Sequence, residues 1–325
     1  MKNPLKISHA ILLSLLVVLV SSLFIPISIN AEITPLKQLK QGISPDKITC
    51  TKGLQLVLKQ TTGMPYCIKE YSIEKLIQRG WAIHFLSDYS DGNNNSKIFK
   101  IGKYEVQTES VQYSDISIGF LARPVFEESF PGVIMIHEWW GLNENIKEMA
   151  KKLASHGYVV LAVDLYGGQV ATTSDEARNL MMSFDKNGGI KNMNSAVSYL
   201  EDHYSPVKIG SLGWCFGGGQ SLNLALNNKL DATVIYYGSL VTDTKTLSAI
   251  TWPVLGIFAE LDKGITVSTV HDFENSLNQL KINNKIIIYP GVDHAFANPS
   301  GNSYAPNASQ DAWQKTLDFL NSNLK

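Results

Sequence analysis

One short segment combines a cysteine with several glycines in a pattern that suits nucleophilic catalysis. Residues 208–219 read KIGSLGWCFGGG, so that Gly213, Cys215 and Gly217 form a Gly-x-Cys-x-Gly motif between an apolar run and a helical stretch. Such a motif permits a sharp turn from strand to helix that exposes the central residue. The dipole at the start of the helix would stabilise a thiolate there. We predict that Cys215 is a nucleophile; the alternative is a buried cysteine in an ordinary strand-to-helix turn.

An acid and a histidine follow this cysteine in the order that a catalytic triad of this geometry requires. Asp262 comes just after an expected strand at 254–258, and His294 lies between the last expected strand and the final expected helix. The order nucleophile, acid, histidine is typical of α/β-hydrolases. We expect Asp262 to hold the imidazole in its productive tautomer, with Glu260 and Asp293 as the alternative acids.

The sequence HEWWG at residues 137–141 directly follows an expected buried strand. In this type of fold, the loop at that place donates one backbone N–H to an oxyanion hole, and the residue after the nucleophile donates the other. Those donors would be the N–H groups of Trp139 and Phe216. Glu138 lies among apolar and aromatic residues. A carboxyl group is costly to bury alone, so we expect Glu138 to have a partner.

The elements that must position these residues alternate between strand and helix from residue 98 to residue 325. The expected strands are 104–113, 115–123, 132–137, 158–164, 207–213, 233–237, 254–258 and 285–289, and the expected helices are 145–156, 175–184, 189–203, 218–227, 267–281 and 311–324. Strands joined by helices in this rhythm predict an α/β fold with a mostly parallel sheet flanked by helices. Each candidate residue follows the end of a strand, which is where reacting groups gather in such sheets.

The first residues of the chain predict export. Residues 1–31 combine Lys2 and Lys6 with a long apolar run and end in Ala31, which is typical of a signal peptide. The apolar run approaches the length that spans a bilayer, so an uncleaved membrane anchor is the alternative. We therefore expect an extracytoplasmic protein, either secreted or anchored, whose only membrane contact is this segment.

A small module is expected between the export signal and the main domain. Residues 32–86 contain a short strand-like piece, an amphipathic stretch at 73–79, and the pair Cys50 and Cys67. In an oxidising compartment these two cysteines are natural disulfide partners. The polar, Asn-rich residues 87–97 read as a linker to the domain at 98–325.

Composition narrows the classes of partner. The 325 residues carry a formal net charge of −1 and contain no run rich in Lys or Arg, so nucleic acid is not an expected partner. Cys215 is the odd one of three cysteines. A redox role for it is disfavoured because no second cysteine completes a C-x-x-C pair. The chemistry outlined above needs neither a metal nor an organic cofactor.

Together, HEWWG at 137–141, DLY at 164–166, GWCFGG at 213–218, Asp262 and HAF at 294–296 resemble the dienelactone hydrolase (carboxymethylenebutenolidase) family. The resemblance covers nearly all of residues 104 to 325. It implies an α/β-hydrolase without a large cap that cleaves a small ester or lactone.

The family pattern assigns a role to each matching residue. It implies Cys215 as nucleophile, His294 as base and Asp262 as acid. It also identifies Glu138 as the glutamate that contacts the thiol in the resting enzyme and is displaced when substrate arrives.

The chain departs from the family where the substrate is held. Members that cleave dienelactones bind the substrate carboxylate with two arginines, and the matching positions here are Gly168 and Asn298. Neither residue binds an anion as a guanidinium does. Ala295 also replaces a hydroxyl residue beside the histidine. The alternative functions are therefore a thioesterase or acyltransferase on the same site, or a non-catalytic binding protein of the same fold.

Overall fold

The computed structural model describes residues 34–41, 43, 48–59, 64–78, 82–84, 97–100, 102–125 and 129–325. The expected signal segment at 1–31 and nearly all of the expected linker at 87–97 lie outside the described residues. Among the helices that are described, none is both long enough and apolar enough to cross a bilayer.

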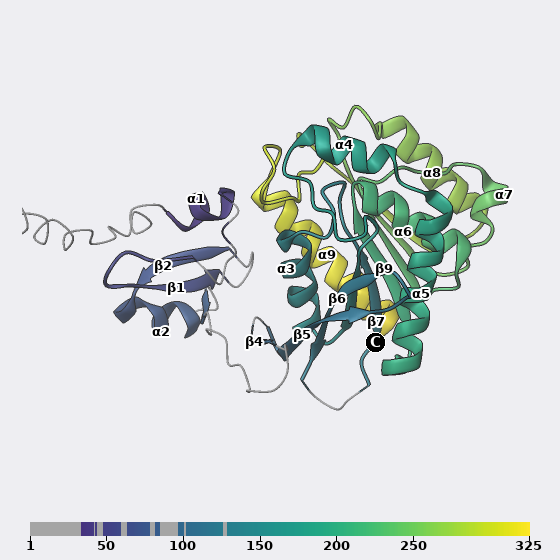
Figure 1. The fold of residues 1–325 in the computed structure, drawn as a ribbon. Helices are drawn as coiled ribbons and strands as arrows, with labels where there is room; N and C mark the ends of the chain where they lie inside the picture. The colour runs from purple at the N-terminus through teal and green to yellow at the C-terminus, as the bar shows by residue number, and fades with distance from the viewer. Residues whose placement is uncertain are drawn as a thin grey trace, which may run out of the picture.

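A nine-stranded sheet forms the centre of the larger part of the molecule, in the order β12-β11-β10-β9-β7-β8-β6-β5-β4 (Figure 1). Its strands are β4 (Lys97–Lys100), β5 (Glu105–Gln112), β6 (Ile118–Pro124), β7 (Gly132–Ile136), β8 (Val159–Val163), β9 (Ile209–Trp214), β10 (Ala232–Tyr236), β11 (Val254–Ala259) and β12 (Asn284–Tyr289). Neighbours from β12 to β8 pair in parallel, whereas β6, β5 and β4 add antiparallel pairs at one edge. The predicted mostly parallel sheet is confirmed.

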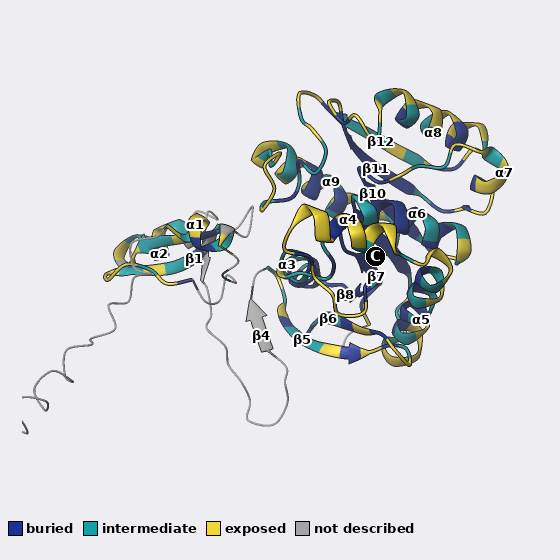
Figure 2. Cartoon of the chain, turned by 45° about the horizontal axis from the view of Figure 1, so that its top comes forward, coloured by how far each residue is buried: buried dark blue, intermediate teal, exposed yellow. Residues whose placement is uncertain are grey.

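Helices cover both faces of this sheet. They are α3 (Glu144–Ala154), α4 (Ser174–Met182), α5 (Lys186–Tyr204), α6 (Phe216–Asn227), α7 (Thr244–Leu247), α8 (Val267–Gln279) and α9 (Pro306–Leu324). Successive residues of β7 point into two different cores: Val133 and Met135 pack with α3 and α9, whereas Ile134 and Ile136 pack with α5, α6 and α8. Figure 2 accordingly shows buried strands between helices whose outer faces are exposed. Burial on both faces explains why these strands are continuous apolar runs.

The strand order reverses direction between β7 and β9. The chain leaves β7 toward β8 on one side and leaves β9 toward β10 on the other, although β7 and β9 are neighbours. Such a switch point opens a crevice at the carboxyl ends of the two strands, where open α/β sheets bind their ligands. The segments HEWWG and GWCFGG, which the sequence singled out, come at the ends of these two strands.

A second, smaller sheet lies in the residues before the linker. Its strands β1 (Leu54–Lys59), β2 (Pro65–Lys69) and β3 (Ala82–His84) pair antiparallel in the order β2-β1-β3 and are accompanied by α1 (Pro35–Lys40) and α2 (Glu70–Gln78). Its buried apolar cluster consists of Val57, Ile73 and Ala82. Cys50 and Cys67 form the expected disulfide, with an S–S distance of 2.02 Å. With so small a core, a covalent link adds needed stability.

Candidate active site

The turn from β9 into α6 brings Cys215 to the edge of the sheet in a strained backbone conformation. Cys215 has a φ of 55° and a ψ of −118°, a left-handed conformation that non-glycine residues rarely adopt. A Cβ on Gly213 would lie 2.0 Å from the carbonyl oxygen of Gly217, and a Cβ on Gly217 would lie 2.3 Å from that of Ile136. Glycine is therefore required at both positions, because the turn packs directly against itself and against β7.

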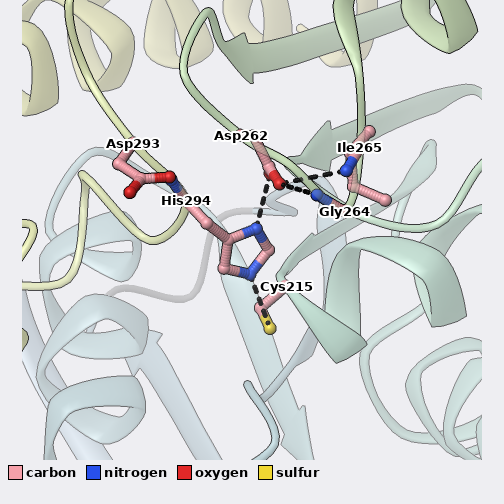
Figure 3. Close-up of polar contacts among 6 residues, drawn as sticks. All are labelled: Cys215, Asp262, Gly264, Ile265, Asp293 and His294. Carbon is pink, nitrogen blue, oxygen red and sulfur yellow. Dashed lines mark hydrogen bonds and ion pairs between the residues drawn. The ribbon is translucent and has the colours of Figure 1, made fainter.

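Asp262, His294 and Cys215 lie in one hydrogen-bonded line (Figure 3). The Nδ1 atom of His294 is 2.6 Å from Oδ2 of Asp262, and its Nε2 atom is 3.1 Å from the sulfur of Cys215. The three residues follow the carboxyl ends of β9, β11 and β12, and β10 lies between β9 and β11 in the sheet. The structure thus brings together side chains that are 79 and 32 residues apart in the chain.

The Asp262 carboxylate is surrounded by hydrogen-bond donors. In addition to His294, the backbone N–H groups of Gly264 and Ile265 donate to its Oδ1 at 2.8 and 3.0 Å. Burial alone would raise the pKa of Asp262, but the hydrogen bonds from His294 and these backbone groups outweigh it and lower the pKa. The alternative acids are engaged elsewhere: Glu260 accepts from the N–H of Gly291, and Asp293 accepts from the backbone N–H of His294.

The same contacts favour a proton on His294. Burial alone would lower the pKa of this imidazole, but the hydrogen bonds to Asp262 and Cys215 and the charges of those groups raise it to about 10. An imidazolium beside a cysteine stabilises the thiolate form of the sulfur, which is the nucleophilic form.

Glu138, which follows the end of β7, has a different environment. Its side chain is buried, and Oε2 accepts a hydrogen bond from Nδ2 of Asn298. The other oxygen, Oε1, has no hydrogen-bond partner among the described residues. Burial raises the pKa of Glu138 to about 7, although the charge of His294 and the amide of Asn298 oppose that shift. The hydrogen bond recorded for the carboxyl is with this amide, whereas the Cys215 sulfur is hydrogen-bonded to His294.

Trp139 and Phe216, the two residues expected to supply the oxyanion donors, lie at the start of the turn after β7 and at the start of α6. Trp139 begins a tight turn after β7 that a hydrogen bond from Gly141 N–H to the Glu138 carbonyl closes at 3.2 Å. Phe216 is the first residue of α6. The N–H groups of a first helical turn have no partner within the helix, so that of Phe216 is available to a ligand.

His137 is a component of the site to which the sequence gave no role. Its ring is completely buried, and each ring nitrogen contacts a backbone group. Nδ1 is 2.6 Å from the carbonyl oxygen of Glu138, and Nε2 accepts from the N–H of Leu165 at 3.1 Å. Only the position of His137 at the end of a buried strand hinted at this, since its contacts come from a distant loop.

Gly168 and Asn298, where arginines were expected from the family pattern, form hydrogen bonds within the protein. Gly168 has a φ of 85°, and its N–H donates to the Asp164 carboxylate, whereas Asn298 donates to Glu138. In the described part of the chain, no group of three or more His, Cys, Asp or Glu side chains is arranged to hold a metal ion.

Comparison with known families decides the relationship of this chain. The model of the dienelactone hydrolase family matches residues 118–324, more than half of the 325 residues. The chain belongs to the dienelactone hydrolase family. As a member of this family, the protein is an ester or lactone hydrolase.

The similarity to other family members extends over almost the whole length of those proteins. A protein of Saccharolobus solfataricus that bears the name carboxymethylenebutenolidase is 32% identical over 240 residues, which cover 62% of this chain and 92% of that protein. A protein of Bradyrhizobium sp. named as a 2-oxo-3-(5-oxofuran-2-ylidene)propanoate lactonase is 30% identical over 236 residues, covering 66% of this chain and 95% of its own.

Solved structures of dienelactone hydrolases share the fold. One from Klebsiella pneumoniae subsp. pneumoniae superimposes with a TM-score of 0.62 at 24% identity, covering 66% of this chain and 98% of its own. A dienelactone hydrolase-like phosphotriesterase from metagenomic libraries gives a TM-score of 0.61 at 21% identity, covering 69% of this chain and 100% of its own. The predicted α/β-hydrolase fold is thereby confirmed.

Proposed function

We propose that this protein cleaves a small ester or lactone by nucleophilic attack of Cys215, with His294 and Asp262 as the other members of a catalytic triad. The observation that supports this most directly is the pair of hydrogen bonds that links Asp262 to His294 and His294 to the sulfur of Cys215. The strained turn at Cys215 supports it too, because backbone strain is a common feature of residues at active sites.

The reaction would proceed in two halves. The thiolate of Cys215 attacks the substrate carbonyl carbon, and the N–H groups of Trp139 and Phe216 hold the oxyanion that forms. When the tetrahedral intermediate collapses, the carbon–oxygen bond to the alcohol breaks, and the leaving oxygen takes the proton of the His294 imidazolium. The acyl group then remains on the sulfur as a thioester.

Hydrolysis of the thioester would regenerate the enzyme. The neutral His294 takes a proton from water as the water oxygen attacks the thioester carbonyl, so the imidazolium forms again. Collapse of this second intermediate expels the thiolate and releases the carboxylic acid. Throughout, the ionised Asp262 stabilises the charge on His294. Protein groups and water suffice for every step.

Glu138 belongs to the proposed site as a carboxyl that yields to the substrate. Its unpartnered Oε1 and the influence of the His294 charge on its pKa indicate that it lies close to the reacting groups. Because burial favours its neutral form, moving it aside should cost less than separating a fully ionised carboxylate from the charge of His294.

The substrate we propose lacks a carboxylate near the scissile bond. Gly168 offers a backbone N–H that is already bonded to Asp164, and Asn298 donates its amide to Glu138. Neither provides a cation for an anionic substrate group. Neutral short-chain esters and lactones are therefore the compounds to test first, with acyl thioesters as the comparison that would reveal a thioesterase.

Replacement of Cys215 by Ala tests the proposal. Hydrolysis of a panel of short acyl esters, lactones and acyl thioesters is expected to fall by about 10⁵- to 10⁶-fold, the size of the loss when a triad nucleophile is removed. The measurement is steady-state kinetics on wild type and variant, with far-UV circular dichroism and the midpoint of thermal unfolding as controls for folding. A variant that folds normally and hydrolyses any panel substrate at the wild-type rate rejects Cys215 as nucleophile.

We also propose that residues 1–31 direct export and that residues 32–86 fold as a separate module, joined through 87–97 to the catalytic domain at 98–325. The Cys50–Cys67 disulfide supports an oxidising compartment, because such bonds persist outside the cytoplasm. Cell fractionation and the intact mass of the recovered protein test the export of the chain, and limited proteolysis at residues 87–97 tests the separate module. A mature chain that starts near residue 32 supports secretion, an uncut chain supports anchoring, and a cytoplasmic location contradicts the proposal.

A further inference from the structure

We infer that His137 is a positioning residue for the oxyanion hole, because its ring fixes the peptide plane that carries the N–H of Trp139. This inference rests on the proposed function, since an oxyanion hole has meaning only for acyl transfer at Cys215. His137 itself touches neither the nucleophile nor a substrate in this scheme; it acts through the backbone.

The hydrogen bonds of the His137 ring define its tautomer. Nε2 accepts from the backbone N–H of Leu165 at 3.1 Å, and a backbone N–H can only donate. Nε2 therefore carries no proton, and Nδ1 must carry the proton of the neutral ring. That proton is donated to the carbonyl oxygen of Glu138, which lies 2.6 Å from Nδ1. Burial lowers the pKa of His137, in keeping with a neutral ring that is 0% exposed.

The carbonyl that His137 binds belongs to the peptide unit that also holds the N–H of Trp139. A trans peptide is planar, so its C=O and N–H point in opposite directions. The carbonyl oxygen of Glu138 accepts from two donors, Nδ1 of His137 and the N–H of Gly141. With this oxygen held on one side, the N–H of Trp139 is directed to the other. Rotation of the same peptide would instead aim a carbonyl at the developing oxyanion and repel it.

The ring of His137 also contacts the other half of the proposed oxyanion hole. It stacks on Phe216 with the ring centroids 5.9 Å apart and the planes 23° apart, and Tyr166 covers it at 4.8 Å. The backbone of His137 is equally close to the nucleophile turn: a Cβ on Gly217 would lie 2.4 Å from the His137 carbonyl oxygen. One buried imidazole therefore joins the loop after β7, the loop after β8 and the start of α6.

The support for this ring continues into the loop after β8. The Asp164 carboxylate accepts from the backbone N–H groups of Tyr166 and Gly168, which shapes the loop that supplies the Leu165 N–H. On the other side, the hydroxyl of Tyr113 and the amide of Asn192 bind the backbone of Asp164. The position of Nε2 is thus set from outside the crevice.

Two variants separate positioning from general structural support. His137→Leu has a similar volume but neither donor nor acceptor, whereas His137→Gln offers an amide N–H to the Glu138 carbonyl and an oxygen to the Leu165 N–H. Each is compared with wild type in ester hydrolysis and in alkylation of Cys215 by iodoacetamide. Alkylation needs the thiolate and its His294 partner but forms no oxyanion, so it reports on the nucleophile alone.

We expect His137→Leu to lower kcat for ester hydrolysis by about 10²- to 10³-fold, the effect of losing one oxyanion donor, with little change in KM. Its alkylation rate should stay within about threefold of wild type, because Asp262, His294 and Cys215 are untouched. The kcat of His137→Gln should be at least about tenfold higher than that of His137→Leu. This pattern supports a positioning role, since general loss of structure would slow both reactions.

Three results would overturn the inference. The first is an unchanged kcat in a folded His137→Leu protein, and the second is an equal fall of hydrolysis and alkylation in both variants. The third is a His137→Gln protein that folds like wild type but remains as slow as His137→Leu. Failure of the proposed function looks different: wild-type Cys215 would then resist iodoacetamide, or Cys215→Ala would keep its activity, whatever the His137 variants do.

Discussion

Two buried carboxyl groups, Asp262 and Glu138, follow the carboxyl ends of strands in the same sheet, and their pKa values are shifted in opposite directions. Asp262 receives three hydrogen bonds, one of them from the imidazole of His294, whose own pKa is raised. These hydrogen bonds lower the pKa of Asp262. Glu138 receives one hydrogen bond from a neutral amide, leaves an oxygen without a partner, and has its pKa raised to about 7. Glu138 is the more completely enclosed of the two and burial dominates its pKa, whereas at Asp262 the hydrogen bonds outweigh burial.

This difference suits a site with a sulfur nucleophile. In the proposed mechanism, the ionised Asp262 stabilises the imidazolium of His294, which in turn would stabilise a thiolate at Cys215. A second ionised carboxylate at Glu138 would compete with that thiolate for the single positive charge of His294. The raised pKa of Glu138 reduces that competition, and carboxyls in one site commonly divide their roles in this way.

The largest effect on activity is expected when the charge of Asp262 is removed. Asp262→Asn keeps the size of the side chain but favours the wrong imidazole tautomer, and we expect kcat/KM for ester hydrolysis to fall by about 10⁴-fold. The matched control is Glu260→Gln in the same loop, whose carboxylate binds the N–H of Gly291 rather than the imidazole. The control should stay within about twofold of wild type, and a comparable loss in both variants would contradict the assignment of the acid.

A second test concerns the pH dependence of stability at Glu138. Its pKa is about 7 when folded against an ordinary value of 4.5, so the folded state holds the proton more tightly than the unfolded state. This group therefore stabilises the fold most at acidic pH, and its contribution falls as pH rises through the folded pKa. In Glu138→Gln that decline should be absent.

Denaturant unfolding of both proteins at a series of pH values measures this effect. The unfolding free energy of Glu138→Gln should gain on that of wild type from about pH 4 to about pH 8, an interval that includes both the ordinary and the folded pKa of Glu138. Parallel curves would mean that folding does not shift the pKa of Glu138, which would contradict the raised pKa on which the comparison depends.

The smallest expected effect comes from the partner of Glu138. Asn298→Leu removes the amide that favours the ionised carboxyl, so the pKa of Glu138 should rise further and the pH-dependent decline should move to higher pH. The lost hydrogen bond should cost about 1 to 3 kcal/mol of unfolding free energy. In a Glu138→Gln background the pH shift should vanish. A shift of the same size in both backgrounds would assign it to another group.

The sequence predicted the parts of this site that depend on local patterns. The Gly-x-Cys-x-Gly motif required a sharp turn, and the structure shows why, since neither Gly213 nor Gly217 has room for a Cβ. The chain order of Asp262 and His294 indicated two further loop ends. Continuous apolar runs predicted the central strands to within about two residues because those strands are buried on both faces.

Contacts between distant segments were beyond such patterns. The cost of burying a carboxyl predicted that Glu138 has a partner, but the sequence did not identify Asn298, 160 residues away, as that partner. The sequence singled out Asn298 only because the family has an arginine at that position. The role of His137 depends on the Leu165 N–H, which only the packing of two loops brings near. Helix α7, with 4 residues, is too short to show a helical period.

Helix starts and the small sheet show the same limit. The predicted helix at 189–203 begins earlier, at Lys186, because the Asp185 side chain caps it through the N–H of Asn187. In the smaller module the sequence predicted one strand-like piece, whereas the structure has three short strands. Strands of 3 to 6 residues carry too few alternations to be recognised individually.

The separation of scaffold and crevice has a consequence for engineering. Strands β7, β9, β10 and β11 are buried along their whole length, whereas the loop at 167–170 beside the crevice is exposed. Gly167 and Gly168 in this loop have positive φ values of 62° and 85°, so a side chain at either position would strain the backbone. We therefore expect substitutions at Gln169 and Val170 to alter the surroundings of the proposed site while leaving both cores intact. Libraries restricted to these few positions should therefore yield folded proteins with new substrate selectivities. Alkylation of Cys215, the proposed nucleophile, would then identify the active clones.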